Sequence, residues 1–172
     1  MDKLIYDGWL KLYKREVKGR AYEIIKNYDG LAVIILNEFN EVLLVKQFRP
    51  AIMDYTLEIP AGCLDIEGEN LESCMAREIE EETGLLVKEE ALELVVTYKP
   101  LMGFTTSNLY IFLTKVKKEE LKTNIINDLD VSEVKWVSIK EIGDMIAKVQ
   151  ILDGKTIMSY YYLMSKLDCG II

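Results

Sequence analysis

The pattern of apolar and polar positions changes its period along the chain. Runs rich in β-branched and aromatic residues, separated by polar turns, predict a series of strands. Later segments repeat their apolar positions with a helical period. Few helices among many strands predict an α/β fold, a mixed-sheet sandwich in one unit. The predicted strands are Trp9–Val17, Arg20–Tyr28, Leu31–Leu36, Val42–Phe48, Tyr55–Ile59, Leu92–Tyr98, Leu109–Val116 and Val134–Val137, and the predicted helices are Asn70–Thr83, Ile139–Val149 and Thr156–Leu167.

The helix expected over residues 70–83 carries acids where apolar residues belong. Asn70 suits its N-cap, and helical spacing places Glu78 and Glu82 on the apolar face beside Ile79, with Glu81 at its border. Carboxylates so close together repel one another, crowd the negative end of the helix dipole and pay a desolvation cost when buried. Divalent cations would offset these penalties, so the pattern favours a metal-binding helix over a merely solvated acidic face.

Composition narrows the chemistry. The chain has 172 residues, half of them hydrophobic, and a net charge of −8, which disfavours binding of a nucleic-acid backbone. It has no histidine, which excludes Ser-His-Asp and Cys-His catalysis and points to carboxylates, metal-bound water and a hard, oxygen-ligated metal. Three scattered cysteines argue against a disulfide framework and a zinc site. With neither an apolar leader nor a long apolar run, we expect a cytoplasmic protein that does not enter the membrane.

The segment Gly62–Leu85, GCLDIEGENLESCMAREIEEETGL, resembles the Nudix box, GX5EX7REUXEEXGU, where U is a bulky aliphatic residue. One departure is present, because six residues rather than five separate Gly62 from Glu69, which leaves the placement of Gly62 and of the Ala61 carbonyl open. Eight positions match in one register, namely Glu69, Arg77, Glu78, Ile79, Glu81, Glu82, Gly84 and Leu85.

The resemblance implies an α/β/α sandwich that binds Mg²⁺, or alternatively Mn²⁺, and hydrolyses a nucleoside diphosphate linked to another group. By matching position, Glu78 and Glu82 would be the main metal ligands, Glu81 would assist, and the Ala61 carbonyl would be a further ligand. The structural positions of the box would be Gly62, Glu69, Arg77 and Gly84.

Outside the box the chain is similar to the ADP-ribose (ADP-sugar) pyrophosphatase branch. The segments Val45–Pro50 and Leu57–Gly62 resemble that branch, and Pro100 stands where a proline marks ADP-ribose enzymes. The resemblance implies a homodimer with an N-terminal strand unit over residues 1–28 and a hydrolase unit over residues 29–172. The implied substrate contacts are Trp9, Tyr22, Arg49, Glu58, Met102 and Gly103.

Several alternatives stay open at this point. Trp9 and Tyr22 suit adenine stacking, but a core or dimer-interface role suits them too. Arg49 would face the phosphate or ribose of the substrate, unless it is a lone surface arginine. Glu58 would bind ribose or water, unless it is a solvent-facing strand residue. The general base would come from the acidic loop before the last strand, either Asp130 or Glu133. GDP-mannose, UDP-glucose or an oxidised nucleotide would suit the same site, and the same fold also serves non-cleaving nucleotide sensors and isomerases.

Overall fold

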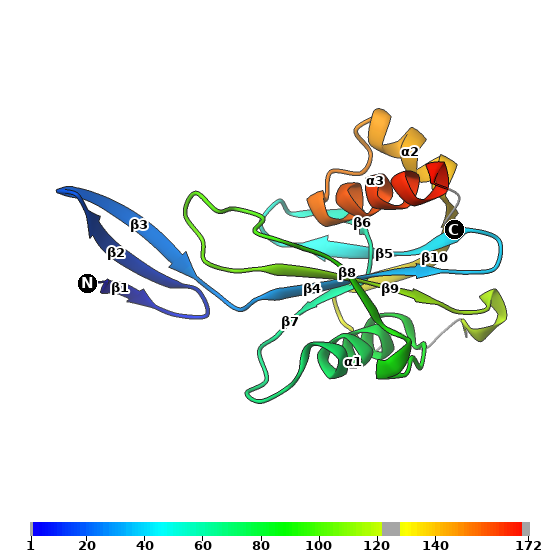
Figure 1. The fold of residues 1–172 in the computed structure, drawn as a ribbon, viewed down its shortest axis with the longest axis horizontal. Helices are drawn as coiled ribbons and strands as arrows, with labels where there is room; N and C mark the ends of the chain where they lie inside the picture. The colour runs from blue at the N-terminus through cyan, green and yellow to red at the C-terminus, as the bar shows by residue number, and fades with distance from the viewer. Residues whose placement is uncertain (1, 122–127, 170–172) are drawn as a thin grey trace.

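The structure is a computed structural model that describes residues 2–121 and 128–169. An N-terminal antiparallel sheet, in the order β1-β2-β3, projects from a body built on a mixed sheet (Figure 1). The body sheet has the order β10-β5-β4-β9-β8, with β6 added to β5 and β7 to β4. The strands are β1 (Lys3–Asp7), β2 (Lys11–Val17), β3 (Arg20–Lys26), β4 (Gly30–Leu36), β5 (Glu41–Arg49), β6 (Asp54–Glu58), β7 (Ala61–Cys63), β8 (Glu93–Tyr98), β9 (Leu109–Lys115) and β10 (Val131–Ser138). The helices are α1 (Leu71–Thr83), α2 (Ile139–Ala147) and α3 (Gly154–Asp168), with the 3-10 turns η1 (Glu89–Ala91) and η2 (Lys118–Glu120).

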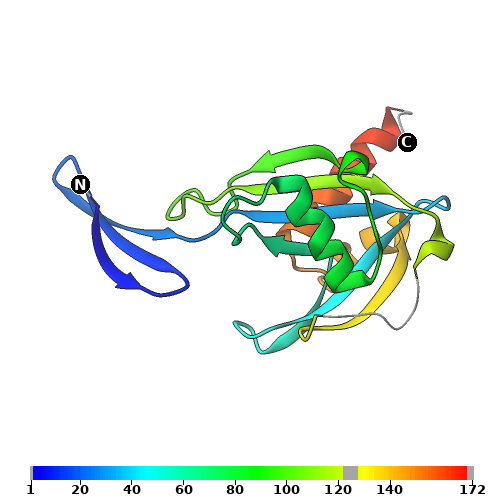
Figure 2. The same cartoon turned by 90° about the horizontal axis from the view of Figure 1, so that it is seen from below.

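Strand β4 divides the core between the two faces of the body sheet. Ala32 and Ile34 pack toward α2 and α3, whereas Leu31 and Val33 pack toward α1. Residues apolar on both faces are what a central strand needs when helices cover both sides. Figures 1 and 2 show this arrangement, with α1 on one side of the sheet and α2 and α3 on the other. The predicted mixed α/β sandwich is therefore confirmed.

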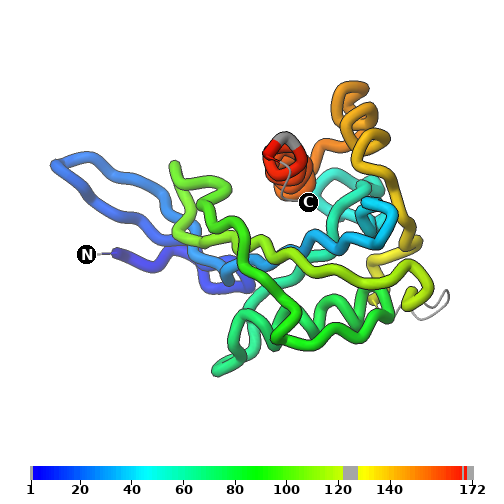
Figure 3. Tube along the Cα trace, turned by 45° about the vertical axis from the view of Figure 1, so that its right-hand side comes forward, coloured from blue at the N-terminus to red at the C-terminus, as the bar shows by residue number. Residues whose placement is uncertain are grey.

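Two connections bring distant segments toward one end of the sheet. Strand β7 pairs with the start of β4, where Ala61 lies opposite Ala32, and this places the segment 61–63 beside α1. The loop between β8 and β9 reaches toward the N-terminal sheet (Figure 3), and the backbone N–H of Ile25 donates to the Phe104 carbonyl at 2.8 Å. The body, the loop and the N-terminal sheet thus meet near residues 25–30.

Some element boundaries differ from the sequence prediction. Strands β1 and β7 were not predicted, and β2 begins at Lys11 rather than Trp9 because residues 8–10 bend. Strand β10 begins at Val131 because its edge pairs with β5, and this pairing places Glu133 in a strand and not in the preceding loop. Residues 122–127 of the polar stretch 117–130 lie outside the described residues. Within the described ranges, no helix is long and apolar enough to span a bilayer.

Candidate active site

Helix α1 is fixed at both ends by its own residues. The Asn70 side chain accepts a hydrogen bond from the Ser73 N–H at 2.7 Å, and Gly84 ends the helix in the left-handed conformation with φ 72°. The buried side chains of Met75 and Ile79 hold the helix on the sheet. The sequence prediction of this helix and of its two ends is confirmed, so the direction in which its acids point is set by packing.

Arg77 gathers three acids around its guanidinium group. Its Nε and Nη2 donate to the two carboxylate oxygens of Glu69, each at 3.2 Å. Its Nη1 donates to Glu78 at 2.8 Å and to Glu81 at 3.2 Å. Arg77 therefore connects the loop before α1 to the acids of the helix. A bracing role for Arg77 and Glu69 requires contacts of this kind.

Glu82 and Glu78 are carboxylates in an unfavourable environment. Glu82 is 1% exposed and accepts one hydrogen bond from the Ala61 N–H at 3.0 Å. Burial raises the pKa of Glu82 to about 8 despite that bond, and like charge on Glu78 and Asp128 adds to the rise. Burial also raises the pKa of Glu78 to about 7, although Arg77 opposes the rise. Both groups would be stabilised in their charged form by a cation.

Gly62 lies directly against Glu78. A Cβ atom at Gly62 would overlap the Glu78 side chain, so no residue larger than glycine fits without displacing that acid. Gly62 therefore lies against α1 despite the extra residue before the helix, and the added length falls between Cys63 and Glu69. Glycine at this position keeps the backbone of Ala61 and Gly62 within reach of Glu82 and Glu78.

The residues fit a hard divalent cation by their chemistry. Across residues 2–121 and 128–169, no three acidic or cysteine side chains already converge at metal-binding distances. Glu78 and Glu81 are turned toward Arg77, and Glu82 toward the Ala61 N–H. The donors that would hold the ion are the carboxylates of Glu78, Glu82 and Glu81 with the Ala61 carbonyl, an all-oxygen set that suits Mg²⁺ or Mn²⁺.

A cavity of about 200 Å³ adjoins these acids and has two cations in its wall. Arg49 and Lys155 line it, together with Ala61 and Gly62. Ala61 and Gly62 in the same wall contact Glu82 and Glu78, so the two cations and the acids of α1 lie on either side of the same backbone segment. Arg49 was predicted from the sequence, whereas Lys155, which lies in the first turn of α3 and is 8% exposed, was not. Nothing in the local pattern distinguishes this lysine from a solvent-exposed one.

Glu58 lies behind the two cations. Its Oε1 accepts from Arg49 Nε at 2.8 Å and from the Thr56 hydroxyl, and its Oε2 binds Arg49 Nη2 and Lys155 Nζ. Burial alone would raise the pKa of Glu58, but the hydrogen bond from Arg49 and the charge of Lys155 lower it to about 2. The side chain is 3% exposed, which excludes the solvent-facing alternative, and it is not part of the cavity wall.

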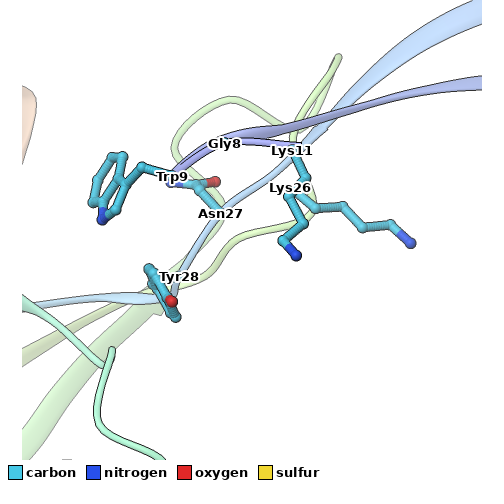
Figure 4. A pocket seen from close by; sticks show the side chains of 6 residues that line it. All are labelled: Gly8, Trp9, Lys11, Lys26, Asn27 and Tyr28. Atoms are coloured by element: carbon cyan, nitrogen blue, oxygen red, sulfur yellow. The ribbon is translucent and has the colours of Figure 1, made fainter. Parts of the chain in front are cut away.

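A second cavity, of about 340 Å³, lies where the N-terminal sheet meets the body. Its wall includes Trp9 and Tyr28, whose ring centroids are 6.2 Å apart, and Lys11 and Lys26 extend away from the two rings (Figure 4). Tyr28 was missed by the sequence analysis. Tyr22, the predicted second aromatic residue, lies near the start of β3, where it pairs with Arg15 of β2. It is not among the residues of the same chain that line this cavity.

The remaining predicted site residues are exposed. Met102 and Gly103 form the tip of the loop between β8 and β9, and Met102 is 76% exposed. Asp130 and Glu133 are also exposed, on the segment that leads into β10 and on β10 itself. Asp128, which the sequence analysis did not single out, is half-buried and close enough to Glu82 to raise its pKa. Among the described acids that lead into β10, Asp128 is the one whose charge contributes to the raised pKa of Glu82.

Comparisons with known proteins agree with this geometry. The family model described as "NUDIX domain" matches residues 26–160. The "ADP-ribose pyrophosphatase" of Bacillus subtilis (strain 168) is 28% identical over 149 residues, which cover 87% of this chain and 79% of that protein. A "Methanol dehydrogenase activator" of Bacillus methanolicus is 29% identical over 142 residues, covering 82% and 75%. A "GDP-mannose pyrophosphatase" of Yersinia enterocolitica is 32% identical over 178 residues, covering 94% and 91%.

Proposed function

The chain belongs to the Nudix family and is a pyrophosphohydrolase, and we propose that it hydrolyses ADP-ribose to AMP and ribose 5-phosphate with Mg²⁺. One observation carries the proposal: the buried carboxylate of Glu82 and the half-buried carboxylate of Glu78 lie beside a cavity whose wall holds Arg49 and Lys155. The acids suit a divalent cation, and the two side-chain cations suit the anionic oxygens of a diphosphate.

Each side chain has a defined task in this proposal. Glu78 and Glu82 hold the cation with help from Glu81 and the Ala61 carbonyl, and Mn²⁺ is the alternative ion. When bound, the ion would neutralise the diphosphate and lower the pKa of a water molecule. Arg49 and Lys155 bind non-bridging phosphate oxygens.

A loop carboxylate then removes a proton from the water. The water oxygen forms a bond to one phosphorus, and the bond from that phosphorus to the bridging oxygen breaks. Asp130 and Glu133 are the candidates from the sequence, and Asp128 joins them because of its coupling to Glu82. Separate D128N, D130N and E133Q variants identify the base, since its loss lowers kcat by roughly 100-fold or more while the other two keep most activity.

The nucleoside end of the substrate is assigned to the N-terminal cavity. Trp9 would stack on the adenine, with either Tyr28 or Tyr22 as the second aromatic residue. Truncation of Trp9 to alanine should raise KM for ADP-ribose, and the effects of Y28A and Y22A decide between the two tyrosines. The loop tip at Met102 and Gly103 is proposed to contact the same substrate.

The assembly is proposed to be a homodimer in the cytoplasm, with residues 1–28 as the dimerising unit and residues 29–172 as the hydrolase unit. Support comes from the N-terminal sheet, which exposes large apolar side chains to an unusual degree. They are Leu4, Ile5, Tyr6, Trp9, Leu10, Val17 and Tyr22.

A panel of nucleoside diphosphate sugars with Mg²⁺ tests the substrate. We expect ADP-ribose to give the highest kcat/KM, with AMP as the nucleotide product. A higher kcat/KM for GDP-mannose would support the second candidate, which the Yersinia enterocolitica relative favours by its name and by its coverage of 94% of this chain. A nucleotide sensor is disfavoured because all the box glutamates are present.

A further inference from the structure

Glu58 connects two cations that come from opposite ends of the sequence of the body. Arg49 is the last residue of β5 and Lys155 is the second residue of α3, yet both bind the carboxylate of Glu58, which ends β6. The residues that follow Glu58 and Lys155 also bind each other, because the Ile59 N–H donates to the Thr156 hydroxyl at 2.9 Å. Two consecutive residues at the end of β6 thus bind two consecutive residues of the first turn of α3.

The carboxylate of Glu58 has no capacity left for a substrate or a water molecule. A carboxylate accepts about four hydrogen bonds. Oε1 binds Arg49 and Thr56, and Oε2 binds Arg49 and Lys155. Its low pKa keeps it ionised at neutral pH, so it cannot donate a proton there and is only a weak base. Direct contact with ribose or water, the role expected from the sequence, therefore does not fit this geometry.

The same bonds determine which atoms of the cations face the cavity. Arg49 uses Nε and Nη2 for Glu58, which directs the remaining edge of the guanidinium, with Nη1, away from that acid. Lys155 is held from a second side by Asp153 at 3.0 Å, and only a small part of its side chain reaches the surface. Long side chains of this kind have many rotamers in water. At this junction both are restricted to the cavity wall.

We propose that Glu58 is a positioning residue that holds Arg49 and Lys155 as a pair of phosphate-binding cations and thereby makes the start of α3 part of the active site. The proposal rests on the proposed function, since it assumes that the cavity receives a diphosphate. Glu58 acts through Arg49 and Lys155 and touches neither the substrate nor the metal. Its loss should therefore weaken substrate binding and leave the chemical step almost intact.

The isosteric variant E58Q tests the proposal, with T56V as the matched control because the Thr56 hydroxyl donates to Glu58 and has no hydrogen bond to Arg49 or Lys155. For the nucleoside diphosphate sugar that is cleaved best, we expect E58Q to raise KM by about tenfold or more and to change kcat by less than about threefold. T56V should leave both within about threefold. A fall in kcat with unchanged KM, or no effect of E58Q, would overturn the proposal.

A coupling measurement separates positioning from a general structural effect. In a K155Q background, E58Q should raise KM by a smaller factor than in the wild type, because one of the two cations through which it acts is gone. Equal factors in the two backgrounds would contradict the proposal. E58Q leaves Lys155 buried beside an amide, which could prevent folding of the single variant. In that case K155Q is compared with E58Q/K155Q. An unchanged KM between these two variants would contradict the proposal.

Binding of ADP, followed by calorimetry, makes the test independent of turnover. If no nucleoside diphosphate sugar is cleaved, the proposed function fails, while weaker binding of ADP by E58Q than by the wild type still supports the positioning role. Equal dissociation constants for ADP in E58Q and wild type would overturn it.

Discussion

At the scale of single residues, the site is built from charges placed where an isolated charge is costly. Glu82 illustrates this best, because its burial disfavours the ionised form that a metal ion requires. Glu58 is equally buried, yet two cations keep it ionised. The difference is that Glu58 finds its counter-charges within the chain, whereas Glu82 would find most of its counter-charge in a ligand.

The first prediction follows from the pKa of Glu82. Since that pKa rises from 4.5 to about 8 on folding, the native state binds more protons than the unfolded state in this window. The free energy of unfolding without metal therefore falls as pH rises through the window. E82Q, which keeps an acceptor for the Ala61 N–H, should be more stable than the wild type at pH of about 8.5 in chelator, by about 1–3 kcal/mol.

Urea unfolding in chelator at pH values of about 5.5 and 8.5 measures this difference, which should shrink at the lower pH. The more exposed Glu81 supplies the control, since E81Q should change the stability much less. Lower stability of E82Q than of wild type at the higher pH would show that Glu82 does not carry an uncompensated charge.

Gly62 gives a second prediction at this scale. In G62A the new methyl group would displace the Glu78 side chain. A displacement of about 1 Å at a catalytic group costs roughly 100-fold in rate, so kcat with Mg²⁺ should fall by about that factor while the protein still folds. Circular dichroism and urea unfolding of G62A and the wild type check that the variant is folded. Full activity of G62A would mean that Glu78 does not need its observed position.

At the scale of elements, α1 was predictable and much around it was not. Its apolar period, its Asn70 cap and its Gly84 end all lie in one continuous segment, so local rules suffice. Strand β7 has three residues and no periodic signal, and β10 starts early because β5 offers it partners far away in sequence. The Glu58–Lys155 pair joins residues 97 positions apart, and no local pattern encodes such a contact.

The cap of α1 allows a prediction about this element alone. N70A removes the acceptor of the Ser73 N–H and should lower the free energy of unfolding by about 1 kcal/mol, whereas N70D should retain most of the stability. Chemical denaturation of both variants measures the effect. Specific activity of the folded N70A protein should match the wild type, and a large loss of activity would indicate that the cap positions the acids as well as the helix.

At the scale of the whole molecule, one cavity lies where the N-terminal sheet meets the body and a second lies in the body beside the start of β4. Trp9 and Tyr28 line one of them, and Arg49 and Lys155 line the other. A nucleoside diphosphate sugar has an aromatic base at one end and an anionic centre, and these are the parts that the proposed function assigns to the two cavities. Because the N-terminal sheet exposes a large apolar surface, we expect a second copy of the chain to cover it in a dimer.

The dimer is tested by mass in solution. Sedimentation equilibrium should give twice 19.8 kDa for the wild type. I5K places a charge on a side chain that is 51% exposed in one chain, so it should weaken the dimer without unfolding the monomer. A monomeric wild type would refute the proposed assembly, and an equally stable I5K dimer would place the interface elsewhere.

The central claim is that Glu82 of α1 holds a divalent cation needed for pyrophosphate hydrolysis. The most direct measurement is the kcat of E82Q and wild type with ADP-ribose and saturating Mg²⁺, read as AMP formed. The predicted result is a fall in the kcat of E82Q by more than roughly 100-fold, which exceeds the roughly 10–100-fold cost of removing a residue that only supports a metal ligand. Mg²⁺ should also no longer raise the melting temperature of E82Q. Full activity of E82Q would contradict the account.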